Sequence, residues 1–370
     1  MENKYGSFLF YLFIYLNTFC KGIGLSNSSK VYMVLLILGI VFLSIKIIGD
    51  KYTRKELMAC FLIFGIGFLT FIITHKVTLF LTCITLCGMK NIDLKKTLKN
   101  ILLIRVVSFI GITGLALLKI IPNKRILMWR SGSFDTRYSL GFGHPNVLQL
   151  SLFIIIALYL YLKGKKAIFF QYILLVLVNF LIYSFSKSRT GFICTLGLIS
   201  VHFFFNKIVK KPNAKKLCKM SLITLVFLMI FSYITGVFYG SNSIITKLDY
   251  FFNGRIRYSN YYLTTYGFSL FGNGKVLTDL NAILDNGYIL MFVQYGVIGI
   301  LLVFGFLSRI IKSDFFKNDY NLFIISIFMF IYLFNESFTP NIFMNFILLF
   351  YSKILFKNNV YNVEGGHNEG

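Results

Sequence analysis

Residues 31–49 read VYMVLLILGIVFLSIKIIG, and this run decides the fold class. A helix needs about 20 mostly apolar residues to cross the hydrocarbon core of a bilayer, so the run predicts a transmembrane helix. We therefore expect an all-α, polytopic integral membrane protein with about 12 transmembrane helices, the count being open by one or two because four runs are short. The other runs lie at residues 5–22, 57–74, 77–89, 101–121, 147–162, 168–185, 190–205, 220–238, 286–308, 321–337 and 340–356.

Composition supports this class and excludes a soluble globular protein. The 370-residue chain is 57% hydrophobic and 14% charged, with a mean hydropathy of +0.74, whereas soluble domains carry about 25% charged residues. No long hydrophilic insertion interrupts the runs, so we expect one membrane domain over residues 1–356. Its two larger outer loops cover about 122–146 and 239–285. Residues 357–370 form a polar, glycine-rich tail that we expect to be disordered and cytoplasmic.

The net charge of +25 would suggest a nucleic-acid partner in a soluble protein. Here the basic residues lie between apolar runs, and more of them fall on the side of the membrane that holds both termini. The connection from Lys207 to Lys219 alone holds six lysines. The positive-inside rule then predicts that both termini are cytoplasmic, and we expect no nucleic-acid partner.

The loop at 122–146 ends in Arg137-Tyr-Ser-Leu-Gly-Phe-Gly-His-Pro-Asn146, which combines a cation, an imidazole and an amide beside the membrane. Such groups can bind anions and transfer protons. His144 and Asn146 directly precede an apolar run, so Asn146 could instead be the N-cap of a helix. Both readings remain open for this segment.

The loop at 239–285 is polar and aromatic. Arg255 and Arg257 can hold an anion, and Asp285 with Asn286 stands at the entrance of the next apolar run, where Asp285 could be a general base or an N-cap. Four tyrosines recur at the spacing of one helix face, which predicts either an aromatic anchor at the membrane surface or a platform on which sugars stack. They are Tyr258, Tyr261, Tyr262 and Tyr266.

Three charged residues stand in or beside apolar runs. Arg105 lies inside one, so it either snorkels to the headgroups or faces a polar cavity. Arg189, in the turn Ser186-Lys-Ser-Arg-Thr-Gly191, could bind a phosphate beside a helix N-terminus or simply belong to an outer turn. Glu336, at the outer end of a run, requires a partner, and the candidates are Arg105, Arg137 and Arg189.

The outer acids argue against a metal site. On this topology no two of them are close in sequence, and Mg²⁺ bound to a diphosphate normally requires carboxylate ligands. Guanidinium groups can neutralise a diphosphate instead, so we expect no metal and no cofactor. The outer acids are Asp135, Asp249, Asp279, Asp285 and Glu336.

The order of motifs along the chain resembles that of Wzy-type repeat-unit polymerases of bacterial capsules and exopolysaccharides, within the O-antigen polymerase and ligase superfamily. Each motif is weak alone, and the resemblance covers most of the chain. The motifs are Asn91-Ile-Asp-Leu-Lys-Lys96, Gly141-Phe-Gly-His-Pro-Asn146, Ser188-Arg-Thr-Gly191, Gly254-Arg255, Leu270-Phe-Gly-Asn-Gly274, Asp285-Asn-Gly-Tyr288 and Asn341-Ile-Phe-Met-Asn-Phe346.

The resemblance implies an enzyme of the bacterial cell membrane that transfers a growing glycan from undecaprenyl diphosphate onto a lipid-linked oligosaccharide repeat unit at the outer face. Its partners would be that lipid-linked oligosaccharide, membrane lipids, a flippase and chain-length regulators. Related ligases carry His before the Asn where this chain has Asp285, which leaves the base open between Asp285 and His144.

The expected roles divide the candidates into diphosphate binding by the arginines and glycan binding by tyrosines and amides. Two other functions compete: a flippase for the same lipid-linked units, which would place its polar groups near the membrane midplane in broken helices, and an O-antigen-ligase-like transferase. The expected diphosphate ligands are Arg137, Arg189, Arg255 and Arg257, and the expected glycan ligands are Tyr258, Tyr262, Asn146 and Asn286.

Overall fold

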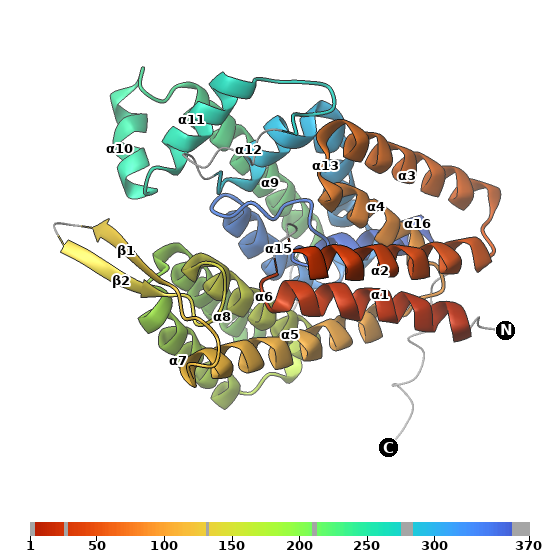
Figure 1. Ribbon diagram of the computed structural model, residues 1–370, viewed down its shortest axis with the longest axis horizontal. Coiled ribbons are helices and arrows are strands. Elements are labelled where there is room, and N and C mark those ends of the chain that lie inside the picture. The colour runs from red at the N-terminus through yellow and green to blue at the C-terminus, as the bar shows by residue number, and fades with distance from the viewer. Residues whose placement is uncertain (1–3, 26–28, 131–132, 209–212, 275–283, 357–370) are drawn as a thin grey trace.

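The computed structural model describes residues 4–25, 29–130, 133–208, 213–274 and 284–356 (Figure 1). The expected tail at 357–370 and the stretch 275–283 of the second outer loop lie outside these residues. Helices dominate the described chain, as predicted, and a single small hairpin is added to them.

The first part of the chain forms five helices, three of which begin at a residue whose side chain caps the helix. Ser29, Thr53 and Asp93 each accept a hydrogen bond from a backbone amide of the helix that follows, and Glu56 completes a capping box with Thr53. α1 packs on α2 and α5, and α3 packs on α4. The helices are α1 (Lys4–Gly22), α2 (Lys30–Gly49), α3 (Arg54–Thr74), α4 (Val77–Gly88) and α5 (Leu94–Leu117).

The first outer loop contains an antiparallel hairpin that the all-α prediction missed. Strand β1 (Arg125–Arg130) pairs with β2 (Ser133–Tyr138), so that Ile126 lies opposite Arg137 and Met128 opposite Asp135. This register places Arg137 on the same face as Met128. The hairpin therefore fixes the direction of the Arg137 side chain before the chain enters the next helix.

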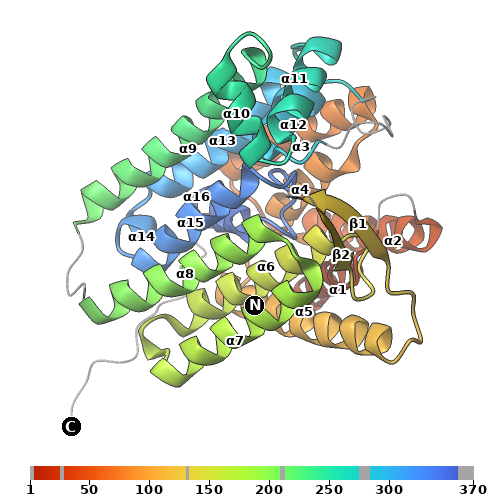
Figure 2. The same cartoon turned by 90° about the vertical axis from the view of Figure 1, so that its left-hand side faces the viewer.

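Four long helices follow, and the next outer region is helical as well. In Figure 1 the hairpin and the pair α10–α11 lie toward the same end of the molecule. Figure 2 shows α6, α7 and α8 grouped together, and α6 and α8 both pack on α15. The elements are α6 (Pro145–Lys163), a 3-10 turn (Gly164–Lys166), α7 (Phe169–Ser186), α8 (Arg189–Ile208), α9 (Ala214–Val237), α10 (Ser243–Phe251) and α11 (Arg255–Tyr266).

The C-terminal part supplies much of the interior. Its elements are α12 (Gly287–Leu290), a π-helical turn (Met291–Tyr295), α13 (Gly296–Lys312), α14 (Asp314–Lys317), α15 (Tyr320–Leu333), a 3-10 helix (Phe346–Tyr351) and α16 (Ser352–Leu355). Nearly every residue from 346 to 352 is buried. The buried core thus lies around α6, α12, α15 and this last segment.

Seven helical stretches are long and apolar enough to cross a membrane, which makes a polytopic membrane protein plausible. Helices also lie in the predicted ranges 5–22, 77–89, 190–205 and 321–337, whereas in the range 340–356 only residues 346–355 are helical, mostly as a 3-10 helix. The figure of about 12 spans remains a prediction. Large apolar side chains on α2, α3, α5, α7 and α9 are exposed, as lipid contact requires. The seven are Lys30–Gly49, Arg54–Thr74, Leu94–Leu117, Pro145–Lys166, Phe169–Ser186, Ala214–Val237 and Gly287–Lys312.

The last of these stretches is interrupted where α13 begins. Gly296 has a φ of 65°, and the loop before α12 packs against the interruption. There Ser269 O accepts from Val297 N at 3.1 Å and Asn273 N donates to Val293 O at 2.9 Å. A Cβ on Gly272 would lie 2.0 Å from the carbonyl oxygen of Gln294. Only glycine allows the backbone at 272 to approach this closely. The close approach lets the loop satisfy backbone groups that the break in the helix exposes.

Candidate functional site

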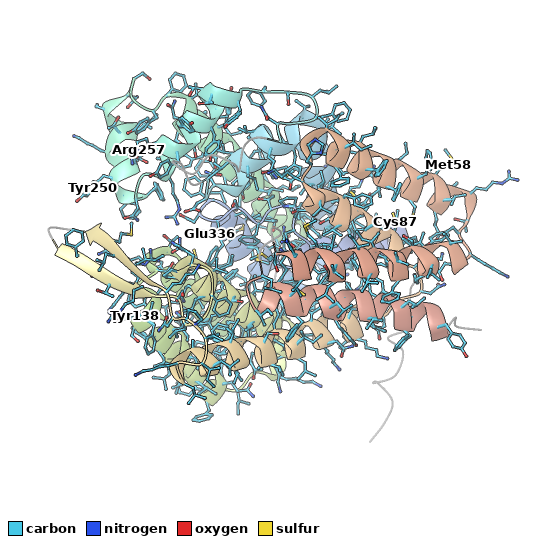
Figure 3. All side chains as sticks on the ribbon, in the orientation of Figure 1. Met58, Cys87, Tyr138, Tyr250, Arg257 and Glu336 are labelled. Atoms are coloured by element: carbon cyan, nitrogen blue, oxygen red, sulfur yellow. The ribbon has the colours of Figure 1, made fainter. Side chains whose placement is uncertain are left out.

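Polar residues from five separate parts of the chain converge where the outer loops meet the helix ends. β2 supplies Arg137, the entrance of α6 supplies His144 and Asn146, and α11 begins with Arg255. Asp285 precedes α12 and Glu336 follows α15. Figure 3 places Glu336 between Tyr138 of the hairpin and the α10–α11 region that holds Tyr250 and Arg257. The fold thus joins both loops that the sequence indicated.

Arg255 lies between two carboxylates. Its Nη2 is 3.5 Å from Asp285 Oδ2 and 3.6 Å from Glu336 Oε1, while its Nε donates to the carbonyl oxygen of Asn335 at 3.2 Å. Asp285 and Glu336 are far apart in sequence, yet these two outer acids meet at one guanidinium in the folded protein. The partner of Glu336 is Arg255 rather than Arg105, Arg137 or Arg189.

Arg137 forms the second cationic centre and is 3% exposed. Its Nε donates to the Ser186 carbonyl oxygen at 2.8 Å and its Nη2 to Asn146 Oδ1 at 2.5 Å. The Asn146 side chain also hydrogen-bonds to Glu336. Asn146 therefore connects the two cationic centres, and charge-assisted bonds of this kind fix a guanidinium in direction as well as in place.

His144, not Asn146, is the N-cap of α6. Its Nδ1 accepts a hydrogen bond from the Asn146 backbone N–H at 3.1 Å. Burial and the charges of Arg137 and Arg255 lower the pKa of His144 to about 4. The imidazole is neutral at pH 7, and because Nδ1 is an acceptor, its proton lies on Nε2. His144 can therefore donate a hydrogen bond from Nε2 but cannot accept a proton there.

Asn286, not Asp285, caps the next helix. Asn286 Oδ1 accepts from the amides of Tyr288 and Ile289 at 3.0 and 3.2 Å, and its Nδ2 donates to Ser232 Oγ at 3.1 Å. The side chain is 3% exposed, so its hydrogen bonds are used inside the protein rather than on a glycan. Asp285 is released from capping and faces Arg255.

The two carboxyl groups both hold their protons more tightly than usual. Burial and the charge of Asp285 raise the pKa of Glu336 to about 8, against opposing effects of Arg255 and Arg137. Burial likewise raises the pKa of Asp285. Buried carboxyl groups whose pKa values are raised in this way are typical of acid–base sites. At pH 7 Glu336 is therefore mostly protonated.

The tyrosines do lie on a helix, as predicted, but they are not equally available. In α11 Tyr262 is fully buried and stacks on Tyr266 with ring centroids 5.7 Å apart, so its ring offers no face to a sugar. Tyr258 is half-buried, and the guanidinium of Arg257 lies 5.2 Å from its ring centroid. Burial therefore argues against a sugar platform at Tyr262, whereas the half-buried Tyr258 and the exposed Tyr261 remain candidates for it.

The remaining arginines lie apart from the convergent groups. Arg189 begins α8 and is exposed, and Arg257 is exposed on α11. Arg105 does not snorkel: it is 1% exposed, and its Nη2 donates to the carbonyl oxygen of Phe343. The structure thus joins Arg137 with Arg255 and leaves Arg189 and Arg257 outside that pair.

Glu336 belongs to the candidate site but was not predicted as a catalytic or binding residue. Its signal in the sequence is an acid beside Asn335 at the end of an apolar run, where an unpaired charge is costly. No cluster of three or more His, Cys, Asp or Glu side chains suited to a metal ion occurs in the described part of the chain.

No protein-family profile, no curated protein sequence and no solved structure matches the chain.

Proposed function

We propose that the protein is a polysaccharide polymerase that transfers a growing glycan from undecaprenyl diphosphate onto a lipid-linked oligosaccharide repeat unit at the outer face of the bacterial cell membrane. The observation that carries the proposal is the meeting of Arg137, Arg255, His144 and a carboxyl pair beside the outer ends of apolar helices. Such a site suits an anionic leaving group that arrives in the membrane.

Each group has a part in that reaction. The oxygen of an acceptor hydroxyl forms a bond to the anomeric carbon of the donor glycan, and the bond from that carbon to the diphosphate breaks. Arg137 and Arg255 hold the diphosphate charge, and His144 donates its Nε2 hydrogen bond to a phosphate oxygen. Asp285 takes the hydroxyl proton, since a raised pKa makes a carboxylate a better base.

A flippase is the second candidate, because the interruption at Gly296 resembles the broken helices in which transporters bind their substrates. Here, however, the loop around Gly272 fills the interruption and hydrogen-bonds to it. The charged groups lie instead at the outer helix ends. A ligase that attaches finished chains to another acceptor would use the same groups, and only its product distinguishes it.

The deciding experiment is chain extension by the purified full-length protein in lipid nanodiscs, supplied with lipid-linked repeat units and monitored for free undecaprenyl diphosphate and longer glycans. Arg255→Gln and Asp285→Asn should each lower the rate about a hundredfold or more, since each removes a group that stabilises the transition state. Lys247→Gln on α10, which removes an exposed outer charge, is the matched control.

The outcomes separate the candidates. Full chain extension by Arg255→Gln and Asp285→Asn would remove these residues from the reaction. If the wild-type protein does not lengthen the glycan, deletion of the gene identifies the alternative function. Single repeat units trapped on the inner face then indicate a flippase, and long unattached polymers indicate a ligase.

A further inference from the structure

Residues 334–345 connect α15 to the 3-10 helix without forming a helix themselves, although most of them are buried. Irregular backbone inside a membrane protein is stable only when protein or water satisfies its polar groups. Some bonds are internal: Asn345 Nδ2 donates to Thr339 O at 3.0 Å and Asn345 N to Asn341 O at 2.7 Å. The segment therefore holds its own shape.

Two buried side chains from the N-terminal half of the protein bind this segment from outside. Thr82 of α4 is 0% exposed; its hydroxyl donates to Pro340 O and accepts from Ile342 N at 3.2 Å. Arg105 of α5 donates to Phe343 O. Both side chains are thus committed to backbone groups of a segment more than 200 residues away in the sequence.

The other end of the same segment enters the candidate site. Asn335 presents its carbonyl oxygen to Arg255 Nε, and Glu336 presents its carboxyl to Arg255 Nη2. Only a few residues separate Glu336 from Pro340, and Phe338 N donates to Glu336 O at 3.1 Å within this interval. A displacement at Pro340 must therefore move the carboxyl of Glu336.

We infer that Thr82 and Arg105 are positioning residues, which hold the segment 334–345 so that Glu336 and the Asn335 carbonyl meet Arg255. The role in catalysis rests on the proposed function, whereas the effect on Glu336 does not. On this inference the buried charge of Arg105 helps to position Glu336, although Arg105 does not contact the candidate site.

The test uses Thr82→Val, because loss of Arg105 would also remove a large buried side chain from α5. Valine keeps the shape of threonine and removes the hydroxyl. Thr85→Val is the matched control, since Thr85 is also 0% exposed and its hydroxyl bonds only to Leu81 O within α4 at 2.5 Å. Thr82→Ser restores the hydroxyl and should restore wild-type behaviour.

The first measurement is hydrogen exchange of the full-length protein in nanodiscs. Amides of residues 335–345 should exchange about tenfold or more faster in Thr82→Val than in the wild type, because two hydrogen bonds to the segment are lost. Thr85→Val should leave them unchanged. Equal exchange of this segment in the two valine variants would refute the inference.

The second measurement is the pH at which Glu336 loses its proton, read from thermal unfolding as a step that Glu336→Gln abolishes. A displaced carboxyl has a different distance to Arg255, so Thr82→Val should move the step by about half a pH unit or more, while a purely structural role would lower stability without moving it. Neither measurement needs turnover, so absence of chain extension would refute the proposed function alone.

Discussion

Glu336→Gln should stabilise the protein at neutral pH, although it removes one partner of an ion pair. The carboxyl of Glu336 lies beyond the end of α15, and its side chain is 13% exposed. Burial and the neighbouring charge of Asp285 raise its pKa from the ordinary 4.5 to about 8. The folded site therefore favours the neutral acid. Glutamine resembles this neutral acid in shape but cannot ionise.

The magnitude follows from proton linkage. The unfolded chain releases this proton above pH 4.5 and the folded protein only above about pH 8, so the folded state binds more protons between these values and stability falls as pH rises. By pH 7 the penalty is about 3 kcal/mol, at about 1.4 kcal/mol per pH unit. Glu336→Gln should remove that penalty and gain little at pH 4.5.

The assay is unfolding of wild type and Glu336→Gln from pH 4.5 to 9 in the same nanodisc lipid, with Asp314→Asn, which changes an exposed carboxylate, as the control. The gap between the curves should widen up to about pH 8 and then stay constant. Asp285→Asn supplies an internal check, because loss of its charge should lower the pKa of Glu336. Parallel curves for wild type and Glu336→Gln would refute the reasoning.

Four further results are expected from chain-extension assays. Arg137→Lys should lower the rate about tenfold or more, because one ammonium nitrogen cannot take the positions of both Nε and Nη2, which bond to Ser186 and Asn146; wild-type rates would contradict this. His144→Gln should retain more activity than His144→Ala, since glutamine keeps an N–H donor, whereas equal loss would favour a base. Tyr258→Leu should raise KM without changing the stability of the protein. Tyr262→Leu should instead lower the unfolding temperature, because Tyr262 is buried. The reverse pattern would restore Tyr262 as a sugar ligand. EDTA should leave turnover unchanged, and loss of turnover in EDTA would show that the reaction requires a metal.

The helices could be predicted because the information is local. A run such as 31–49 is apolar over a length that fits the bilayer, and the structure forms α2 there. The hairpin was missed because a pair of short strands has little local signal beyond the turn-favouring Ser131-Gly132 between them. Its first strand holds four consecutive apolar residues, 126–129, and so lacks the alternation of apolar and polar residues that marks a strand.

The candidate site was predictable as a set of residue types but not as a set of contacts. Helix caps depend on backbone angles within one or two residues, and so the cap is His144 rather than Asn146, and Asn286 rather than Asp285. The meeting of Asp285 with Glu336 depends on how α12 and α15 pack, about which neither local sequence carries information.

Charge balance explains why these groups are gathered where water is scarce. At pH 7 His144 is neutral and Glu336 is mostly protonated, so of the carboxyl pair only Asp285 can offset the charge of Arg137 and Arg255. Ionising Glu336 would reduce the positive charge of the site, and protonating His144 would add a positive charge that the folded site disfavours. The two pKa shifts therefore keep an uncompensated cationic charge between about pH 5 and 7, in a partly buried place where it acts on an anion more strongly than it would in water. An incoming diphosphate would complete the site electrostatically, and its departure with the lipid carrier would restore the starting charge.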